Sequence, residues 1–235
     1  MLWSVLRGGI SSVWDFLFML LGYVILLGIM MPVHEAAHAW AANRLGDPTA
    51  RHMGRLTLNP LAHLDPIGST MILLFGIGYA KAVPVQPRYF RDPRKGMALT
   101  ALAGPASNIL LAVISIALFR GIAAVSGGLI EFGGQLYLQG DVLYYAYIVL
   151  VVVLARVNLS LAVFNLLPIP PLDGSRIFSA FLPLKWVVWI DRYHEYVRMG
   201  VLLLIVTGIL DKPLLFLTGA VGNGLCMLFG LPHLF

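Results

Sequence analysis

Long apolar runs without a charged residue are the feature that most constrains how this chain can fold. The run between Asp15 and His34 contains no charge, and four more apolar runs cover residues 96–119, 142–172 (interrupted by Arg156 alone), 199–210 and 214–235. About 20 apolar residues in a helix cross the roughly 30 Å hydrocarbon core of a bilayer. The runs therefore predict an all-α polytopic membrane protein with about four to six membrane helices.

The composition supports the same class. Charged residues make up 11% of the chain and hydrophobic residues 59%, whereas an average soluble domain is about 25% charged. This excludes a soluble enzyme, a disordered tail and a nucleic-acid-binding protein, and makes the lipid bilayer a partner of the chain. The length predicts a single membrane-embedded domain over residues 1–235. The single cysteine, Cys226, excludes an internal disulfide and a metal site built from cysteines.

Twelve of the sixteen Lys and Arg residues gather in three groups, within residues 44–55, 81–95 and 176–198. The loop at 121–140 has no Lys or Arg, so the positive-inside rule places the three basic groups in the cytoplasm and this loop outside. The prediction is a multi-pass protein of the cell membrane.

Residues 66–80 are apolar but too short for an ordinary spanning helix, and in this topology they must enter and leave on one side. We expect a short re-entrant or β-hairpin segment near residues 50–85, with Gly68, Gly76 and Gly78 permitting turns. Irregular backbone at membrane depth is tolerated only where it is buried in protein or lines a water-filled cavity. The segment therefore hints at a functional site.

The sequence His34-Glu35-Ala36-Ala37-His38 matches the motif H-E-x-x-H. Two histidines four residues apart share one face of a helix and can bind one metal ion together. Glu35 lies beside the first of them and can accept a proton from a water on the metal. Ionisable groups at membrane depth are costly and usually functional. The motif predicts a hydrolase with one Zn2+ per chain and an active site toward the cytoplasmic side.

A catalytic zinc normally has three protein ligands and one open position. In metzincins the motif continues with Gly three residues and His six residues after the second histidine. This chain has Ala41 and Arg44 at those positions, so it does not have that third ligand. A glutamate further along the chain, the third ligand of thermolysin-like enzymes, is excluded as well. No Glu occurs between Glu35 and Glu131, and Glu131 lies in the outside loop. Asp173 is the best remaining candidate for the third ligand.

The helix that precedes Asp173 ends in a proline-rich turn. The turn reads Asn165-Leu-Leu-Pro-Ile-Pro-Pro-Leu-Asp173-Gly174, and its prolines break a helix because they lack the N–H donor. His52 and His63 are alternative ligands, but we favour a role for them as hydrogen-bonding residues of a cytoplasmic-side hairpin.

The HEAAH motif, the proline-rich turn and Gly104-Pro-Ala-Ser-Asn108 together resemble the site-2 protease family of intramembrane zinc metalloproteases. The resemblance covers about residues 13–210. It implies a core of three membrane helices that carries the zinc site. The PDZ insert and the CBS domain of some relatives are missing from the sequence, so the chain looks like a minimal member.

The same resemblance assigns roles to single residues. It implies zinc ligation by His34, His38 and Asp173, with Glu35 as the catalytic base. It also implies that Asn108 lies near the zinc, where it binds substrate or the oxyanion. Asn165 would be a similar site residue. On physical grounds alone both asparagines are ambiguous, since such residues often hydrogen-bond neighbouring membrane helices.

The expected reaction is hydrolysis of peptide bonds in or near the transmembrane segments of membrane proteins. Two alternatives keep the same fold, namely a catalytically silent membrane scaffold and a transporter that uses the metal residues as a midplane site. A scaffold has no need for Glu35 beside a ligand, and the sequence lacks the internal repeats typical of transporters.

Arg156 needs a partner, a cavity or a route to the interface. The sequence makes no prediction of the oligomeric state.

Overall fold

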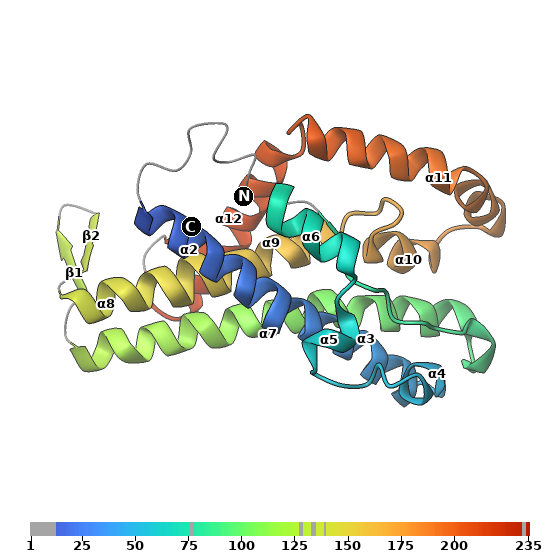
Figure 1. Ribbon diagram of the computed structural model, residues 1–235, viewed down its shortest axis with the longest axis horizontal. Helices are drawn as coiled ribbons and strands as arrows, with labels where there is room; N and C mark the ends of the chain where they lie inside the picture. Colours follow the sequence, from blue (N-terminus) through green and yellow to red (C-terminus); the bar gives the residue numbers. More distant parts are fainter. Residues whose placement is uncertain (1–12, 76–77, 127–128, 133–134, 139, 232–233) are drawn as a thin grey trace. The chain divides into compact units, whose positions relative to one another are not determined.

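The computed structural model describes residues 13–75, 78–126, 129–132, 135–138, 140–231 and 234–235, and most of them are helical (Figure 1). The α-helices are α2 (Val13–Ile25), α3 (Met31–Arg44), α4 (Thr49–His52), α5 (Pro60–His63), α6 (Pro66–Phe75), α7 (Pro93–Ser126), α8 (Asp141–Ala146), α9 (Arg156–Asn165), α10 (Asp173–Ser179), α11 (Leu184–Val206) and α12 (Asp211–Leu228). The wider or tighter helical turns are η1 (Leu26–Met30), η2 (Pro87–Tyr89) and η3 (Tyr147–Ala155). The predicted all-α class is confirmed.

Three helical stretches among the described residues are long and apolar enough to cross a membrane: Leu20–Arg44, Pro93–Ser126 and Leu143–Asn165. They carry, in that order, the HEAAH motif, Asn108 and Asn165. The predicted total of four to six membrane helices stays a prediction.

Two of these stretches contain π-helical turns. The turn η1 lies directly before α3, and η3 lies directly before α9. π-Helical turns are rare in proteins, and those that occur are often found at functional sites. Here each one precedes a helix that carries predicted site residues.

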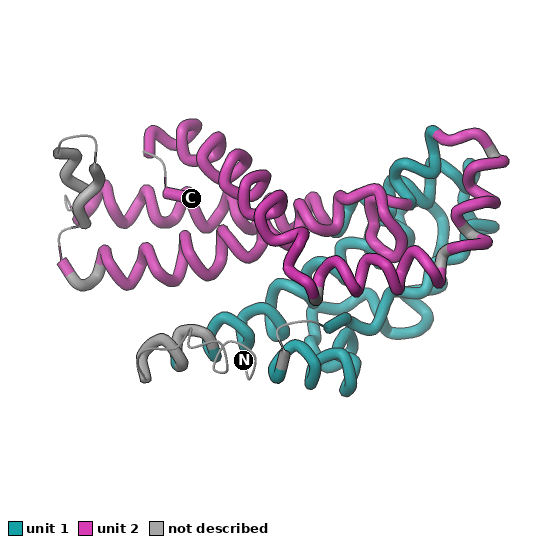
Figure 2. Tube along the Cα trace, turned by 90° about the horizontal axis from the view of Figure 1, so that it is seen from above, with its two compact units in different colours: residues 1–104, 176–181 teal, residues 105–175, 182–235 magenta. Residues whose placement is uncertain are grey.

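The chain divides into two compact units, which Figure 2 colours separately. Unit 1 comprises residues 1–104 and 176–181, and unit 2 comprises residues 105–175 and 182–235. Each is described by itself below. The single domain over residues 1–235 stays a prediction.

In unit 1 the short helices α4 and α5 pack against α3 (Figure 1). The chain that follows α6 packs back against α6, and this close contact depends on two glycines. A Cβ atom on Gly68 would collide with the carbonyl oxygen of Tyr79, and one on Gly78 would collide with the carbonyl oxygen of Gly68. The chain needs both glycines to approach itself so closely.

The described part of residues 50–85 contains helices and extended chain but no strand, so the β-hairpin alternative does not hold there. The irregular residues 78–86 bond to side chains and to the carbonyl oxygen of His63 at the end of α5 rather than to a partner strand. The described strands are β1 (Leu129–Phe132) and β2 (Gln135–Leu138), which pair antiparallel in the loop predicted to lie outside. The re-entrant alternative stays a prediction.

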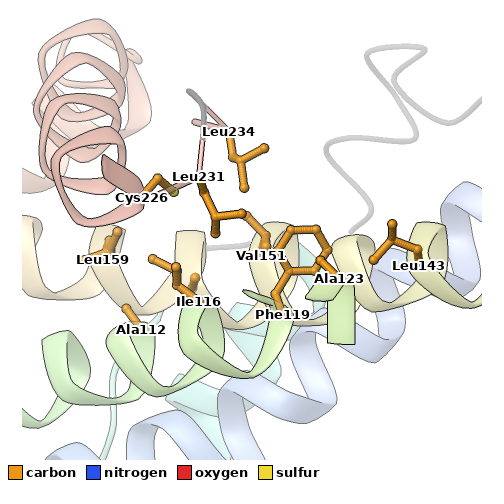
Figure 3. Close-up of a cluster of buried hydrophobic side chains, with 11 residues drawn as sticks. Ala112, Ile116, Phe119, Ala123, Leu143, Val151, Leu159, Cys226, Leu231 and Leu234 are labelled. Atoms are coloured by element: carbon orange, nitrogen blue, oxygen red, sulfur yellow. The ribbon is translucent and has the colours of Figure 1, made fainter. Parts of the chain in front are cut away.

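In unit 2 eleven buried apolar side chains form a cluster between α7, α8, η3, α9 and α12 (Figure 3). Phe119 of α7 points into its centre and is fully buried. The helix α12 packs against α9, and the chain after it adds Leu231 and Leu234 to the cluster.

Arg156 has its partners in the same unit. Its Nη2 donates to the carbonyl oxygen of Leu234 at 3.4 Å, and its guanidinium lies 5.4 Å from the centre of the Phe235 ring. On α7, Nε of Arg120 donates to the carbonyl oxygen of Phe229 at 3.2 Å. The two arginines thus bind the segment that follows α12.

The position of Phe119 leads to a stability prediction. Phe119→Ala should leave a cavity in the unit 2 cluster and lower the free energy of unfolding by about 3–5 kcal/mol. Leu118→Ala is the control on the same helix, because Leu118 is 55% exposed. Thermal unfolding of both variants in the same detergent checks this, and equal shifts in melting temperature would contradict the assigned core.

Candidate metal centre

The helix α3 brings the two histidines of the HEAAH motif face to face. Pro32 lies in the first turn of α3, directly after the π-helical turn η1. His34 and His38 are each 8% exposed, and their Nε2 atoms lie 3.1 Å apart. The two rings meet edge-on, with an interplanar angle of 88°.

This spacing fits two nitrogen ligands of a single ion. Two zinc–nitrogen bonds of about 2.0–2.1 Å at a tetrahedral angle would place the nitrogens about 3.3 Å apart. The 3.1 Å between the Nε2 atoms of His34 and His38 is close to that value. The residues of α3 therefore fit a zinc ion by their spacing as well as by their chemistry.

A backbone carbonyl selects the tautomer of the neutral His38 imidazole. Its Nδ1 lies 2.7 Å from the carbonyl oxygen of Thr100 on α7. A carbonyl oxygen only accepts hydrogen bonds, so Nδ1 must carry the proton and Nε2 keeps its lone pair. Metal-binding histidines usually have such a partner, which also fixes the ring orientation.

Gly104 of α7 provides the space that the histidine pair occupies. A Cβ atom on Gly104 would collide with Nε2 of His38 and lie within 2.6 Å of Cε1 of His34. Any side chain at this position would therefore meet the proposed ligand atoms.

Glu35 contacts a segment far away in the sequence. Its Oε2 accepts a hydrogen bond of 3.2 Å from the backbone N–H of Val83, which lies in the extended chain after α6. The carboxylate is half-buried. One oxygen is thereby oriented by the protein, and Oε1 remains for a second partner.

Asp173 belongs to unit 2, where it is the first residue of α10. Its Oδ2 is buried. The turn before it contains a cis peptide bond between Pro170 and Pro171. A Cβ atom on Gly174 would collide with the carbonyl oxygen of Leu166, so this glycine lets α10 start directly against the end of α9.

The two predicted asparagines differ in their surroundings. Asn108 is fully buried, and neither polar atom of its amide has a hydrogen-bond partner in the described part of the chain. Asn165 is half-buried, and its Nδ2 donates to the carbonyl oxygen of Leu161 one turn earlier. A buried amide without a partner calls for an explanation such as a ligand, so Asn108 is the stronger candidate.

The two histidines considered as alternative ligands behave as hydrogen-bonding or surface residues. Nε2 of His63 lies 2.8 Å from the carbonyl oxygen of Thr57, and the His63 carbonyl accepts from the N–H of Lys81. His52 is exposed. The structure adds Thr100 and Val83 to the site, two residues that act through backbone atoms and therefore leave no side-chain signal in the sequence.

A family model, Peptidase family M50, matches residues 22–207, which include every site residue described above. The chain belongs to peptidase family M50. The predicted resemblance to site-2 proteases is confirmed, and this M50 chain is a metalloprotease.

Relatives of this M50 chain carry the same assignment in their names. It is 41% identical to "Putative zinc metalloprotease YwhC" of Bacillus subtilis over 168 residues, 68% of each chain. It is 32% identical to "Putative zinc metalloprotease Rip2" of Mycolicibacterium smegmatis over 70% of this chain and 57% of that relative. The chain thus spans between half and two thirds of its mycobacterial relative. No solved structure matches it.

The contact at Gly104 yields a prediction about metal binding. Gly104→Ala should displace the imidazoles of His34 and His38 and reduce bound zinc from about one ion per chain to well below one. The control is Gly121→Ala on the same helix, where an added Cβ meets nothing within 4 Å. Zinc content of both purified variants, measured by elemental mass spectrometry, tests the geometry. Full occupancy in Gly104→Ala would contradict it.

Proposed function

We propose that this chain is a zinc-dependent intramembrane endopeptidase that cuts peptide bonds in or near the transmembrane segments of membrane proteins. One observation carries the proposal. Two histidine nitrogens 3.1 Å apart, with Glu35 next to the first histidine, lie in a helix long and apolar enough to cross a membrane. A soluble peptide would not reach such a position easily, whereas a membrane-embedded substrate would.

Zinc is the ion that the donor set favours, and Asp173 is its third protein ligand in this proposal. His34 and His38 each offer one imidazole nitrogen, and Asp173 offers one carboxylate oxygen. Two histidines and a carboxylate are a known ligand set of catalytic zinc, and they leave a fourth position open. The relatives named as zinc metalloproteases support this assignment.

The residues of the chain divide the work of hydrolysis. When bound, zinc acts as a Lewis acid that polarises the scissile carbonyl and makes a water more acidic. Glu35 accepts the proton of the attacking water on its carboxylate and passes it to the leaving amine. The bond from His38 to Thr100 keeps the imidazole in the tautomer that binds metal.

Asn108 is proposed to donate a hydrogen bond to the substrate carbonyl as negative charge develops there. It lies four residues after Gly104 in α7 and therefore on the same face of that helix. Its unpartnered, buried amide supports the role, because an oriented donor in a dry site stabilises an oxyanion strongly. Asn165 is proposed as a site residue by the family resemblance alone.

The substrate must be extended where it is cut, because a helical peptide bond is shielded and its carbonyl is already bonded. The chain at residues 78–86 is neither helix nor strand, and the N–H of Val83 within it bonds to Glu35. We propose that the segment within residues 50–85 is re-entrant and holds the unwound substrate by backbone pairing.

The proposed location is the cell membrane, with the active site toward the cytoplasm. The support is the distribution of basic residues, which flank the ends of the spanning stretches at 44–55 and 81–95 and are missing from 121–140. The oligomeric state has no support from any observation and is not proposed.

Loss of Asp173 should remove zinc. We expect Asp173→Ala to weaken zinc binding by more than the roughly 10- to 100-fold that follows the loss of a hydrogen-bond partner of a ligand. Asp211→Ala, which removes an exposed acid from the start of α12, should keep its zinc. Competition with a chelator of known affinity measures both, and an unchanged affinity in Asp173→Ala would remove this residue from the metal site.

Loss of the base should abolish cleavage without loss of metal. Glu35→Gln should reduce kcat by about 10²- to 10⁴-fold, because the amide cannot accept the proton of the water. Glu195→Gln serves as the control, since Glu195 is exposed and pairs with Arg198. The assay uses proteoliposomes and a labelled single-span peptide whose helix is interrupted by Gly and Asn. Unchanged cleavage by Glu35→Gln would remove the protease assignment.

A further inference from the structure

The irregular residues Lys81–Gln86 are hydrogen-bonded at both ends. At the first end, the N–H of Lys81 donates to the carbonyl oxygen of His63 at 2.9 Å, and Nη2 of Arg55 donates to the carbonyl oxygen of Lys81. At the other end, the N–H of Gln86 donates to Oδ2 of Asp47 at 2.6 Å. We call residues 81–86 the strap.

The middle of the strap touches the catalytic base. Val83, three residues before Gln86, donates its N–H to Oε2 of Glu35. Pro84 follows Val83 and Pro87 follows Gln86, and neither proline has a backbone N–H. Gln86 has an extended backbone and lies three residues after Val83, so the anchor at Gln86 restrains the position of the Val83 donor through a short length of chain.

Asp47 ties the strap to the helix that carries the base. It follows the end of α3, and its N–H donates to the carbonyl oxygen of Ala42 at 2.9 Å. Its side chain is fully buried. Oδ1 accepts the N–H and the hydroxyl of Thr49 at 2.9 and 2.5 Å, which leaves Oδ2 for Gln86.

The charge of Asp47 suits an anchor. Burial alone raises the pKa of Asp47, while the bonds from Gln86 and Thr49 lower it. The positive charge of Arg88 lowers the pKa further, so that it ends below its ordinary value. Asp47 is therefore ionised at neutral pH, and hydrogen bonds to an ionised acceptor are about twice as strong as neutral ones.

We propose that Asp47 is a positioning residue for the peptidase reaction: it anchors the strap at Gln86, and the strap holds Glu35 through the N–H of Val83. The inference rests on the proposed function, because it concerns the base of that reaction. Asp47 acts at a distance, since its partners are Gln86, Thr49 and Ala42 and it has no bond to Glu35 itself.

The test is Asp47→Asn in the full-length chain. An asparagine keeps the shape but replaces one acceptor oxygen with a donor, so it cannot accept from both Gln86 and Thr49. We expect kcat on the labelled single-span peptide to fall about 10- to 100-fold, as for a misplaced catalytic group, with KM and zinc content unchanged. Hydrogen exchange measured by mass spectrometry should show faster exchange at the amides of both Gln86 and Val83.

Two controls separate this role from a local structural one. Asp92→Asn makes the same substitution at another turn aspartate, whose Oδ1 accepts from the N–H of Arg94 and of Lys95, but it does not touch the strap. Thr49→Val removes one bond to Asp47 and leaves Gln86 its acceptor. Both controls should keep kcat within about twofold of the wild type and leave Val83 protected, since exposed or local substitutions have small effects.

Three results would overturn the proposal: a kcat in Asp47→Asn equal to that of Asp92→Asn, an unchanged protection of the Val83 amide, or a loss of zinc. If Asp47→Asn does not fold, Gln86→Pro removes the same hydrogen bond from the donor side and is judged by the same results.

Failure of the proposed function would look different. In that case the wild type would not cleave the peptide and Glu35→Gln would change nothing. The exchange of the Val83 amide would still report whether Asp47 anchors the strap.

Discussion

A polar group inside a membrane helix must find its partner within the protein, and the metal centre follows from that requirement. His38 meets it with the carbonyl oxygen of Thr100, and the same bond selects the nitrogen that is left for a metal. Arg120 and Arg156 meet it with the carbonyl oxygens of Phe229 and Leu234. Each of these partners is a backbone carbonyl, so no second charge has to be removed from water to satisfy the first.

A hydrogen bond to a backbone carbonyl requires two chain segments to lie close together. Glycine permits this close approach because it has no Cβ atom. Gly104 lies against the imidazoles of His34 and His38, and Gly174 lies against the carbonyl oxygen of Leu166 just after Asp173. Both glycines stand next to a proposed ligand because a larger residue would move that ligand. Small residues at contacts between membrane helices act in the same way.

The part of the site that the sequence could predict is the part with local spacing. The pair His34 and His38 follows from helical periodicity, and the spanning stretches follow from uncharged length. The bonds that orient the site join residues 39, 48 and 62 positions apart, and each of the three uses a backbone atom on one side. Val83 and Thr100 contribute only an N–H and a carbonyl, which every residue but proline has. No residue type could have marked them.

The irregular chain beside Glu35 also bears on how water would reach the proposed site. In a helix the backbone N–H groups are already bonded, so only an irregular segment can donate one to a carboxylate. Irregular backbone has further polar groups that lipid cannot satisfy, and it is stable at membrane depth only beside protein or water. Pro84 and Pro87 reduce the number of such groups without removing them. If the segment is re-entrant as proposed, it borders protein or water rather than lipid, and the proposed hydrolysis of a peptide bond consumes water.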